Sequence, residues 1–226
     1  HKPQPAQGTD PSTAERLSIV IGDVSGKGVA AGLLMAMVKT CLYALNKQPI
    51  TPKAILLSTN QMLYEHINAK KFMTMLYLTW EPEQRLLRYS SAGHEHILVY
   101  RAKPVEAKGD VSQAQTEGNR PLLGRVESIL SGGFMLGMMP DINEFLEDRS
   151  LSLQVGDKVI LYTDGVTEAR NPQEELFSLP SLVKVIEQHG SKTAEELLVK
   201  IKEEVYQFIG SREQYDDITL VVMEAT

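Results

Sequence analysis

The order of the predicted secondary-structure elements is the feature that most constrains the fold. Helices and strands occur in groups along the chain and do not alternate one by one. The predicted strands lie at 17–21, 72–80, 86–91, 97–101, 145–153, 158–163 and 218–223, and the predicted helices at 28–46, 52–68, 179–188 and 193–209. A doubly wound parallel sheet needs a crossover helix between successive strands. The order therefore argues against that fold and favours a layered α+β fold.

The first predicted helix, at 28–46, is unusually apolar. Val29, Leu33, Met37, Cys41 and Leu45 recur with a spacing of four residues, which indicates a helix. Other apolar residues lie off this row. A helix that is apolar on most sides is either deeply buried or covered by a partner.

Length and composition indicate one globular domain spanning residues 1–226. The chain has 42% apolar and 23% charged residues, and 226 residues suffice to bury a sizeable core. The segment 102–132 is rich in glycine with scattered charge and is predicted to be a surface insertion. The first residue is His1 and not Met, so we expect the chain to begin partway into a longer product.

Charge and hydropathy argue against two classes of function. The net charge is −6, whereas nucleic-acid-binding domains usually carry basic patches, so no nucleic-acid partner is expected. The longest run of apolar and small residues, at 28–38, is too short for a membrane span of about 20 residues. The single cysteine, Cys41, excludes an internal disulfide and fits a reducing compartment. The expected location is therefore the cytoplasm. The domain could there belong to the cytoplasmic part of a larger, membrane-anchored sensor protein.

Three aspartates lie beside the ends of predicted strands. Asp23 and Asp164 each follow an apolar strand, and Asp216 precedes the last strand. If the last strand runs antiparallel to the other two, the three carboxylates gather at one edge of the sheet. Clustered carboxylates repel one another unless protons or cations intervene, and Mg²⁺ or Mn²⁺ prefers such hard oxygen ligands. Each aspartate alone also fits a turn or a helix cap, and that alternative stays open.

Other motifs give weaker signals. The segment GDVSGKG at 22–28 has three residues between its first two glycines and a glycine after the lysine, so it is not a Walker A loop. His94 and His96 have the His-x-His spacing of a transition-metal site, but without a nearby Cys or a third His, a histidine that caps a turn at a strand end is the favoured interpretation. Cys41 lies on the apolar helix row, and nothing near it in the sequence would lower its pKa, so it is not proposed as a nucleophile.

Four segments, taken in order, resemble a known family. They are IGDVSGKG at 21–28, SAGH at 91–94, LYTDGVTEARN at 161–171 and YDDIT at 215–219. This set resembles the SpoIIE-like (stage II sporulation protein E) branch of the metal-dependent protein phosphatases, which are relatives of the type 2C serine/threonine phosphatases. The resemblance covers about residues 17–224.

The resemblance implies a four-layer α-β-β-α sandwich with two mainly antiparallel sheets and two Mn²⁺ or Mg²⁺ ions at one edge. It also implies hydrolysis of phosphoserine or phosphothreonine on a STAS-type anti-sigma-factor antagonist. By the same resemblance, Asp23 bridges both ions and the Val24 carbonyl binds one of them. Asp164 and Asp216 hold the other ion, and Asp217 lies behind these ligands. No catalytic residue beyond the metal ligands is implied.

The chain departs from the family pattern at its beginning. The family carries a further aspartate on a strand about twenty residues before the position of Asp23, and Asp10 does not match it. Either that strand lies upstream of His1 or the site has lost a ligand. Two hypotheses follow: an active phosphatase, or a phosphatase-like binding and signalling module with little or no turnover. In both, an attached or separate sensor domain is expected as a regulatory partner, and homodimerisation stays open.

Overall fold

The computed structural model describes residues 16–66, 71–102, 125–214 and 216–226, which form two four-stranded antiparallel sheets. Sheet A has the order β1-β2-β3-β6 and sheet B the order β5-β4-β7-β8. The strands of sheet A are β1 (Leu17–Val24), β2 (Met73–Glu81), β3 (Leu86–Ala92) and β6 (Arg149–Ser152). Those of sheet B are β4 (Ile97–Arg101), β5 (Arg125–Ile129), β7 (Lys158–Tyr162) and β8 (Leu220–Glu224).

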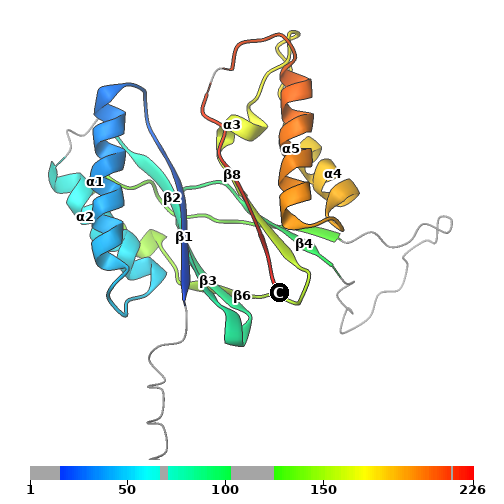
Figure 1. The fold of residues 1–226 in the computed structure, drawn as a ribbon. Helices are drawn as coiled ribbons and strands as arrows, with labels where there is room; N and C mark the ends of the chain where they lie inside the picture. Colours follow the sequence, from blue (N-terminus) through cyan, green and yellow to red (C-terminus); the bar gives the residue numbers. More distant parts are fainter. Residues whose placement is uncertain (1–15, 67–70, 103–124, 215) are drawn as a thin grey trace, which may run out of the picture.

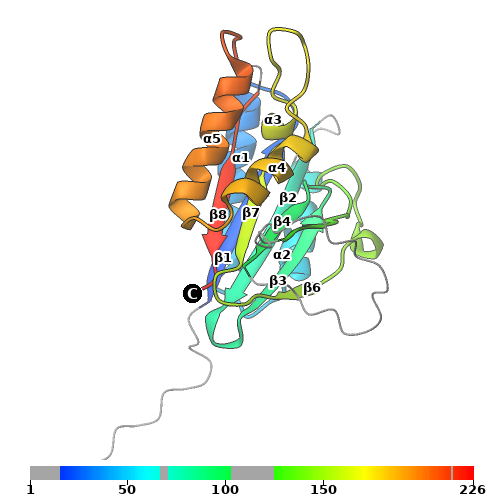
Figure 2. The ribbon, with the colours of Figure 1, turned by 90° about the vertical axis from the view of Figure 1, so that its right-hand side faces the viewer.

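The sheets pack face to face, and helices cover their outer faces (Figures 1 and 2). Helices α1 (Val29–Leu45) and α2 (Pro52–His66) cover sheet A, and α4 (Leu179–His189) and α5 (Ala194–Ile209) cover sheet B. A four-residue helix, α3 (Asp164–Thr167), follows β7, and short 3₁₀ turns lie at Pro82–Gln84 and Asn143–Phe145. The predicted four-layer α-β-β-α sandwich is confirmed.

Strand periodicity produces three separate apolar layers. On β2, Met75 and Tyr77 point towards α1 and α2, whereas Leu76 and Leu78 point towards sheet B. Because successive side chains of a strand face opposite sides, one strand contributes to two cores. The layer between the sheets holds their inner faces together and so fixes where the strand ends meet. Its buried members are Ile21, Leu76, Leu78, Leu87, Tyr89, Ile97, Val99, Leu153, Val159, Leu161 and Ala225.

The apolar row of α1 is not the buried face of the helix in its first half. Val29 and Leu33 are 81% and 62% exposed, whereas Ala31, Leu34 and Val38 are buried. The helix is apolar around most of its circumference, so the spacing predicted a helix correctly but could not show which face packs on the sheet. An exposed apolar surface therefore remains on α1.

The predicted insertion at 102–132 is wrong at its C-terminal end. Residues 125–129 form β5, which pairs with β4 in sheet B. The charged Glu127 hid this strand in the sequence, and in the structure the Arg101 Nε and Nη2 atoms donate to it at 3.1 Å. The rest of the predicted insertion, residues 103–124, lies outside the described residues.

No helix within the described ranges combines the length and the apolar character needed to cross a membrane.

A buried carboxylate ties the turn before β7 to the end of β4. Asp157 is 1% exposed and accepts hydrogen bonds from Arg101 Nη1 at 2.7 Å, Ala102 N at 3.0 Å and Gln154 N at 2.9 Å. If the carboxylate were removed, the two backbone N–H groups would lose their acceptor, whereas Arg101 Nη1 would keep the Ser152 carbonyl. A buried group without a partner costs far more free energy than a lost surface contact.

Replacing Asp157 with alanine should therefore lower the free energy of unfolding by about 2–4 kcal/mol, because the Ala102 and Gln154 N–H groups would lose their acceptor and Arg101 would keep only Glu127 as a carboxylate partner. Urea unfolding followed by circular dichroism measures this change. The matched control is Glu147→Ala, which breaks a surface pair with Arg149 whose side chains are 66% and 42% exposed. The control should change the free energy of unfolding by at most about 1 kcal/mol. Equal effects of the two substitutions would contradict the assigned role of Asp157.

Candidate metal centre

The turn after β7 places Asp164 beside the loop that carries Asp216. Strands β7 and β8 are antiparallel, with Tyr162 opposite Leu220. This is the strand direction required for Asp164 and Asp216 to lie at the same edge of the sheet. The Thr163 backbone N–H donates to the Thr219 carbonyl at 3.1 Å, and the Thr163 hydroxyl accepts from the Thr219 N–H at 3.0 Å. The start of α3 and the end of the 216–219 loop are therefore held together.

Gly165 permits this close approach. A Cβ atom built on Gly165 would lie 2.2 Å from the backbone oxygen of Asp217, so any side chain there would push the two segments apart. The glycine after Asp164 is thus required by packing across the site.

Asp23 lies at the end of β1, with Thr74 as its register partner on β2. The turn after it is held by Ser25, whose backbone N–H donates to the Phe72 carbonyl and whose hydroxyl accepts from the Phe72 N–H, both at 2.9 Å. Lys71 Nζ donates to the Ser25 carbonyl at 2.9 Å. These contacts fix the segment that carries Asp23 and the backbone carbonyl of Val24.

The carboxylates from the two sheets lie within electrostatic range of one another. Burial raises the pKa of Asp23 above its ordinary value, and the charge of Asp164 raises it further, with smaller effects from Asp216 and Asp217. Lys27 Nζ lies 4.0 Å from Asp216 Oδ1, which connects the turn after β1 to the loop before β8. We call the edge that carries Asp23, Asp164, Asp216 and Asp217 the acidic edge.

The donor chemistry of the acidic edge fits a hard divalent cation. Its side chains offer carboxylate oxygens, and their repulsion is the kind that a cation relieves. Within the described residues, no three His, Cys, Asp or Glu side chains are positioned to hold a single ion. Mg²⁺ usually keeps several waters and needs only one or two protein carboxylates, so this arrangement is compatible with it. The assignment of Asp23, Val24, Asp164 and Asp216 as ligands stays a prediction.

One further carboxylate of this region was not predicted from the sequence. Glu95 is half-buried in the connection between β3 and β4. Burial raises its pKa, and the charges of Asp164 and Glu168 raise it further. In the sequence, the only sign of a role for Glu95 is that it directly follows the SAGH segment. That position does not indicate that the side chain lies near Asp164 in the fold.

The two histidines of the His-x-His motif have different partners. His94 is buried, and its Nδ1 atom lies 3.0 Å from Thr74 Oγ1. The Nδ1 atom of His96 lies 3.0 Å from Ser128 Oγ. The described contacts thus connect the two rings to different parts of the fold, as expected for structural histidines.

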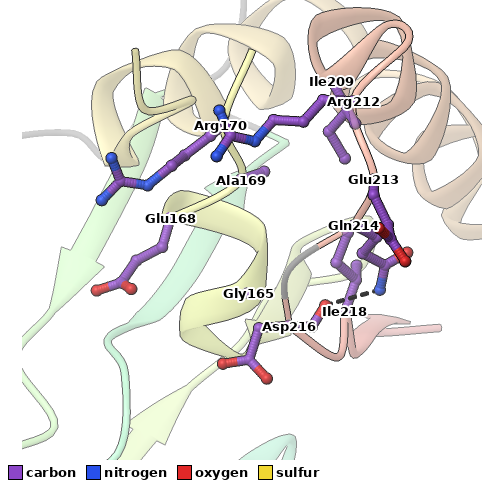
Figure 3. Close-up of a pocket in the computed structure, with 10 residues that line it drawn as sticks. All are labelled: Gly165, Glu168, Ala169, Arg170, Ile209, Arg212, Glu213, Gln214, Asp216 and Ile218. Atoms are coloured by element: carbon purple, nitrogen blue, oxygen red, sulfur yellow. Dashed lines mark hydrogen bonds between the residues drawn. The ribbon is translucent and has the colours of Figure 1, made fainter. Parts of the chain in front are cut away.

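The cavity beside Asp216 is small (Figure 3). Its volume is about 20 Å³, enough for about one water molecule. The carboxylates of Glu168 and Asp216 lie on one side of α3 in this view, and the guanidinium groups of Arg170 and Arg212 lie on the other. A phosphorylated side chain could not enter this cavity, so any such substrate would contact the open surface of the edge.

Comparisons with known proteins agree with this architecture. Residues 13–226 match the family model "Stage II sporulation protein E (SpoIIE)". The chain is 29% identical over 214 residues to phosphoserine phosphatase RsbU of Bacillus subtilis (strain 168), covering 92% of this chain and 56% of RsbU. The chain therefore spans little more than half the length of that curated relative.

Two solved structures show the same fold. The RsbU and RsbW domains of Rv1364c from Mycobacterium tuberculosis superpose with a TM-score of 0.72 at 23% identity, covering 93% of this chain and 52% of that one. RsbX in complex with magnesium gives a TM-score of 0.62 at 17% identity, covering 95% of this chain and 82% of that one. Because the family model matches nearly the whole chain, the protein belongs to the SpoIIE family.

Proposed function

We propose that this domain is a metal-dependent serine/threonine protein phosphatase that uses Mn²⁺ or Mg²⁺ at the acidic edge. The observation that carries the proposal is the convergence of Asp23, Asp164 and Asp216 from two sheets, with the electrostatic effect of Asp164 and Asp216 on the pKa of Asp23. Membership of the SpoIIE family and the similarity to a phosphoserine phosphatase support it. The magnesium complex of RsbX, a structural neighbour, supports the choice of cation.

The roles of the residues follow from their positions. Asp23 would contact both ions, and the Val24 carbonyl would face one of them from the turn that Ser25 and Lys71 hold. Asp164 and Asp216 would hold the second ion from sheet B. When bound, a pair of such ions acidifies a water molecule for attack on phosphorus and neutralises charge on the phosphoryl oxygens.

The proposed substrate is a phosphoserine or phosphothreonine of a STAS-type anti-sigma-factor antagonist. A protein substrate fits the site because the cavity beside Asp216 is too small for a phosphorylated side chain, whereas the edge itself is open. The exposed apolar surface of α1, with Val29 and Leu33, supports a sensor domain or a second subunit as the regulatory partner. The cytoplasm is the proposed location, in keeping with the free thiol of Cys41.

We further propose that an additional strand, upstream of His1, pairs with β1 and carries the further aspartate of the family. Strand β1 is at the edge of sheet A. A groove of about 480 Å³ lies between it and α1, with Val20, Met35 and Tyr43 among its lining residues. An extended segment at this edge would pair with the backbone groups of β1 that have no partner strand among the described residues.

One observation favours the alternative of a phosphatase-like binding module. Within the residues that the structure describes, no three ligand side chains are arranged around one ion. A site that lacks one ligand could grip a phosphorylated partner and turn it over slowly or not at all.

Replacing Asp23 with asparagine should stabilise the metal-free domain at pH 7. The pKa of Asp23 is raised above 3.8, so the folded chain binds this proton more tightly than the unfolded chain. Its contribution to stability therefore falls as pH rises from 3.8 through the folded-state pKa, and the ionised carboxylate is unfavourable above that window. The gain should be below about 1 kcal/mol, because solvent screens a partly exposed carboxylate.

Urea unfolding with and without Mn²⁺ tests this expectation. Added Mn²⁺ should raise the unfolding midpoint of the wild type by mass action and leave that of D23N unchanged. Asp141→Asn is the control, since Asp141 is not among the charges that act on Asp23. An equal Mn²⁺ response in wild type and D23N would remove Asp23 from the ligand set.

The parent protein, with any residues upstream of His1, should release phosphate from a phosphoserine STAS-type protein in Mn²⁺ and stop in EDTA. Asp23→Asn should lower this rate by at least about 100-fold, because losing a direct ligand exceeds the 10–100-fold effect of outer-shell changes. Phosphate release is measured by malachite green. If the parent protein binds the phosphorylated partner tightly but shows no Mn²⁺-dependent release of phosphate, the domain is a binding module and not an active phosphatase.

A further inference from the structure

The connection between β3 and β4 crosses from sheet A to sheet B beside the acidic edge. Its backbone is fixed at two points: the Gly93 N–H donates to the Gly132 carbonyl at 3.0 Å, and the Ser131 hydroxyl donates to the His94 carbonyl. His94 itself is 6% exposed. The position of its ring is therefore set by the fold and not by solvent.

The ring of His94 connects the two halves of the acidic edge. Its Nδ1 atom lies 3.0 Å from the hydroxyl of Thr74, the residue opposite Asp23 in the pairing of β1 with β2. The ring also lies near the backbone carbonyl of Tyr162, two residues before Asp164. A single side chain thus contacts the strand that positions Asp23 and the strand that leads to Asp164.

His94 is suited to a fixed hydrogen bond and not to proton transfer. Burial lowers its pKa to about 4, and the Tyr162 carbonyl opposes this effect only in part, so the ring is neutral at pH 7. Nε2 is buried and has no hydrogen-bond partner among the described residues. Among the described residues, the bond with Thr74 is therefore the one side-chain hydrogen bond of the ring, and the Tyr162 carbonyl is its polar neighbour from sheet B.

A directional contact matters at this place because the inner faces of the two sheets pack through apolar side chains, and the Arg101–Ser152 hydrogen bond between them lies at β4 and β6. Ile21, Leu76, Val99 and Leu161 pack there. Apolar packing is non-directional. By itself it therefore fixes the distance between the two sheets more firmly than the sliding of one sheet over the other. A hydrogen bond requires both a distance and an angle and therefore also fixes the alignment.

We propose that His94, through its hydrogen bond with Thr74, is a positioning residue that holds Asp23 in register with Asp164 across the two sheets. This inference rests on the proposed metal site. It assigns to the histidine of the SAGH segment a role in the geometry of the site without contact with ion or substrate.

The test compares two isosteric substitutions on the same strand. Thr74→Val removes the hydroxyl that meets His94, and Thr79→Val removes one that has no hydrogen-bond partner in the described structure. By calorimetric titration, Thr74→Val should weaken Mn²⁺ binding roughly tenfold, the lower end of the range for groups that orient metal ligands. Thr79→Val should bind Mn²⁺ as the wild type does, and the two variants should have similar melting temperatures.

Variants of His94 separate positioning from simple packing. His94→Ala should weaken Mn²⁺ binding as Thr74→Val does, and the double variant should be no weaker than either, because both remove one shared contact. His94→Asn places an amide near the position of Nδ1 and should recover most of the affinity. Additive losses, or a loss in Thr79→Val equal to that in Thr74→Val, would overturn the proposal.

A metal-free measurement keeps this test separate from that of the proposed function. Nitrogen-15 NMR of the imidazole and of the Asp164 and Gly165 amides should show shifts in Thr74→Val and none in Thr79→Val. If the parent protein with unsubstituted residues fails to bind Mn²⁺, the proposed metal function is wrong, and these signals alone decide on the role of His94. Unchanged Asp164 and Gly165 signals in Thr74→Val would refute it whether or not metal binds.

Discussion

Repulsion among the carboxylates of the acidic edge is maintained by the packing of the two sheets. Asp23 belongs to sheet A, whereas Asp164 and Asp216 flank strands of sheet B. In an extended chain these charges would lie far apart, and only the apolar layer between the sheets brings them together. That packing raises the pKa of Asp23, first through burial and then through the charge of Asp164, with smaller effects of Asp216 and Asp217. Folding thus creates an unfavourable cluster of charge that protons or cations can relieve.

A layered α+β fold and the convergence of the three aspartates could be predicted from local patterns, whereas the four-layer sandwich and the ligand roles were what the family resemblance implied. Runs of apolar and β-branched residues end directly at Asp23 and Asp164, and a similar run begins shortly after Asp216. The antiparallel pairing of β7 with β8 then brings Asp164 and Asp216 to the same end of sheet B. The family resemblance supplied the identity of the ions and the substrate class, which no pattern of hydrophobicity could give.

The failures of prediction have physical causes. The apolar row of α1 predicted the helix but could not show its buried face, because a helix that is apolar on most sides has no single apolar stripe. Strand β6 begins at Arg149, later than the predicted 145, because Asp148 instead accepts from the Lys53 N–H at 2.8 Å at the start of α2. Glu95 and His94 were missed as neighbours of the site because their position depends on the crossing between the sheets. Such tertiary placement leaves no periodic signal in a sequence.

The acidic edge also limits how a phosphorylated partner could be recognised. A phosphoryl group is negatively charged and would be repelled by Asp23, Asp164 and Asp216. The nearby arginines do not offset this effect, since Arg170 and Arg212 both pair with Glu174. Cations at the edge would therefore be needed for the partner to bind as well as for hydrolysis. A binding module without turnover would share this requirement, so the two candidate functions differ in the chemical step and not in the need for metal.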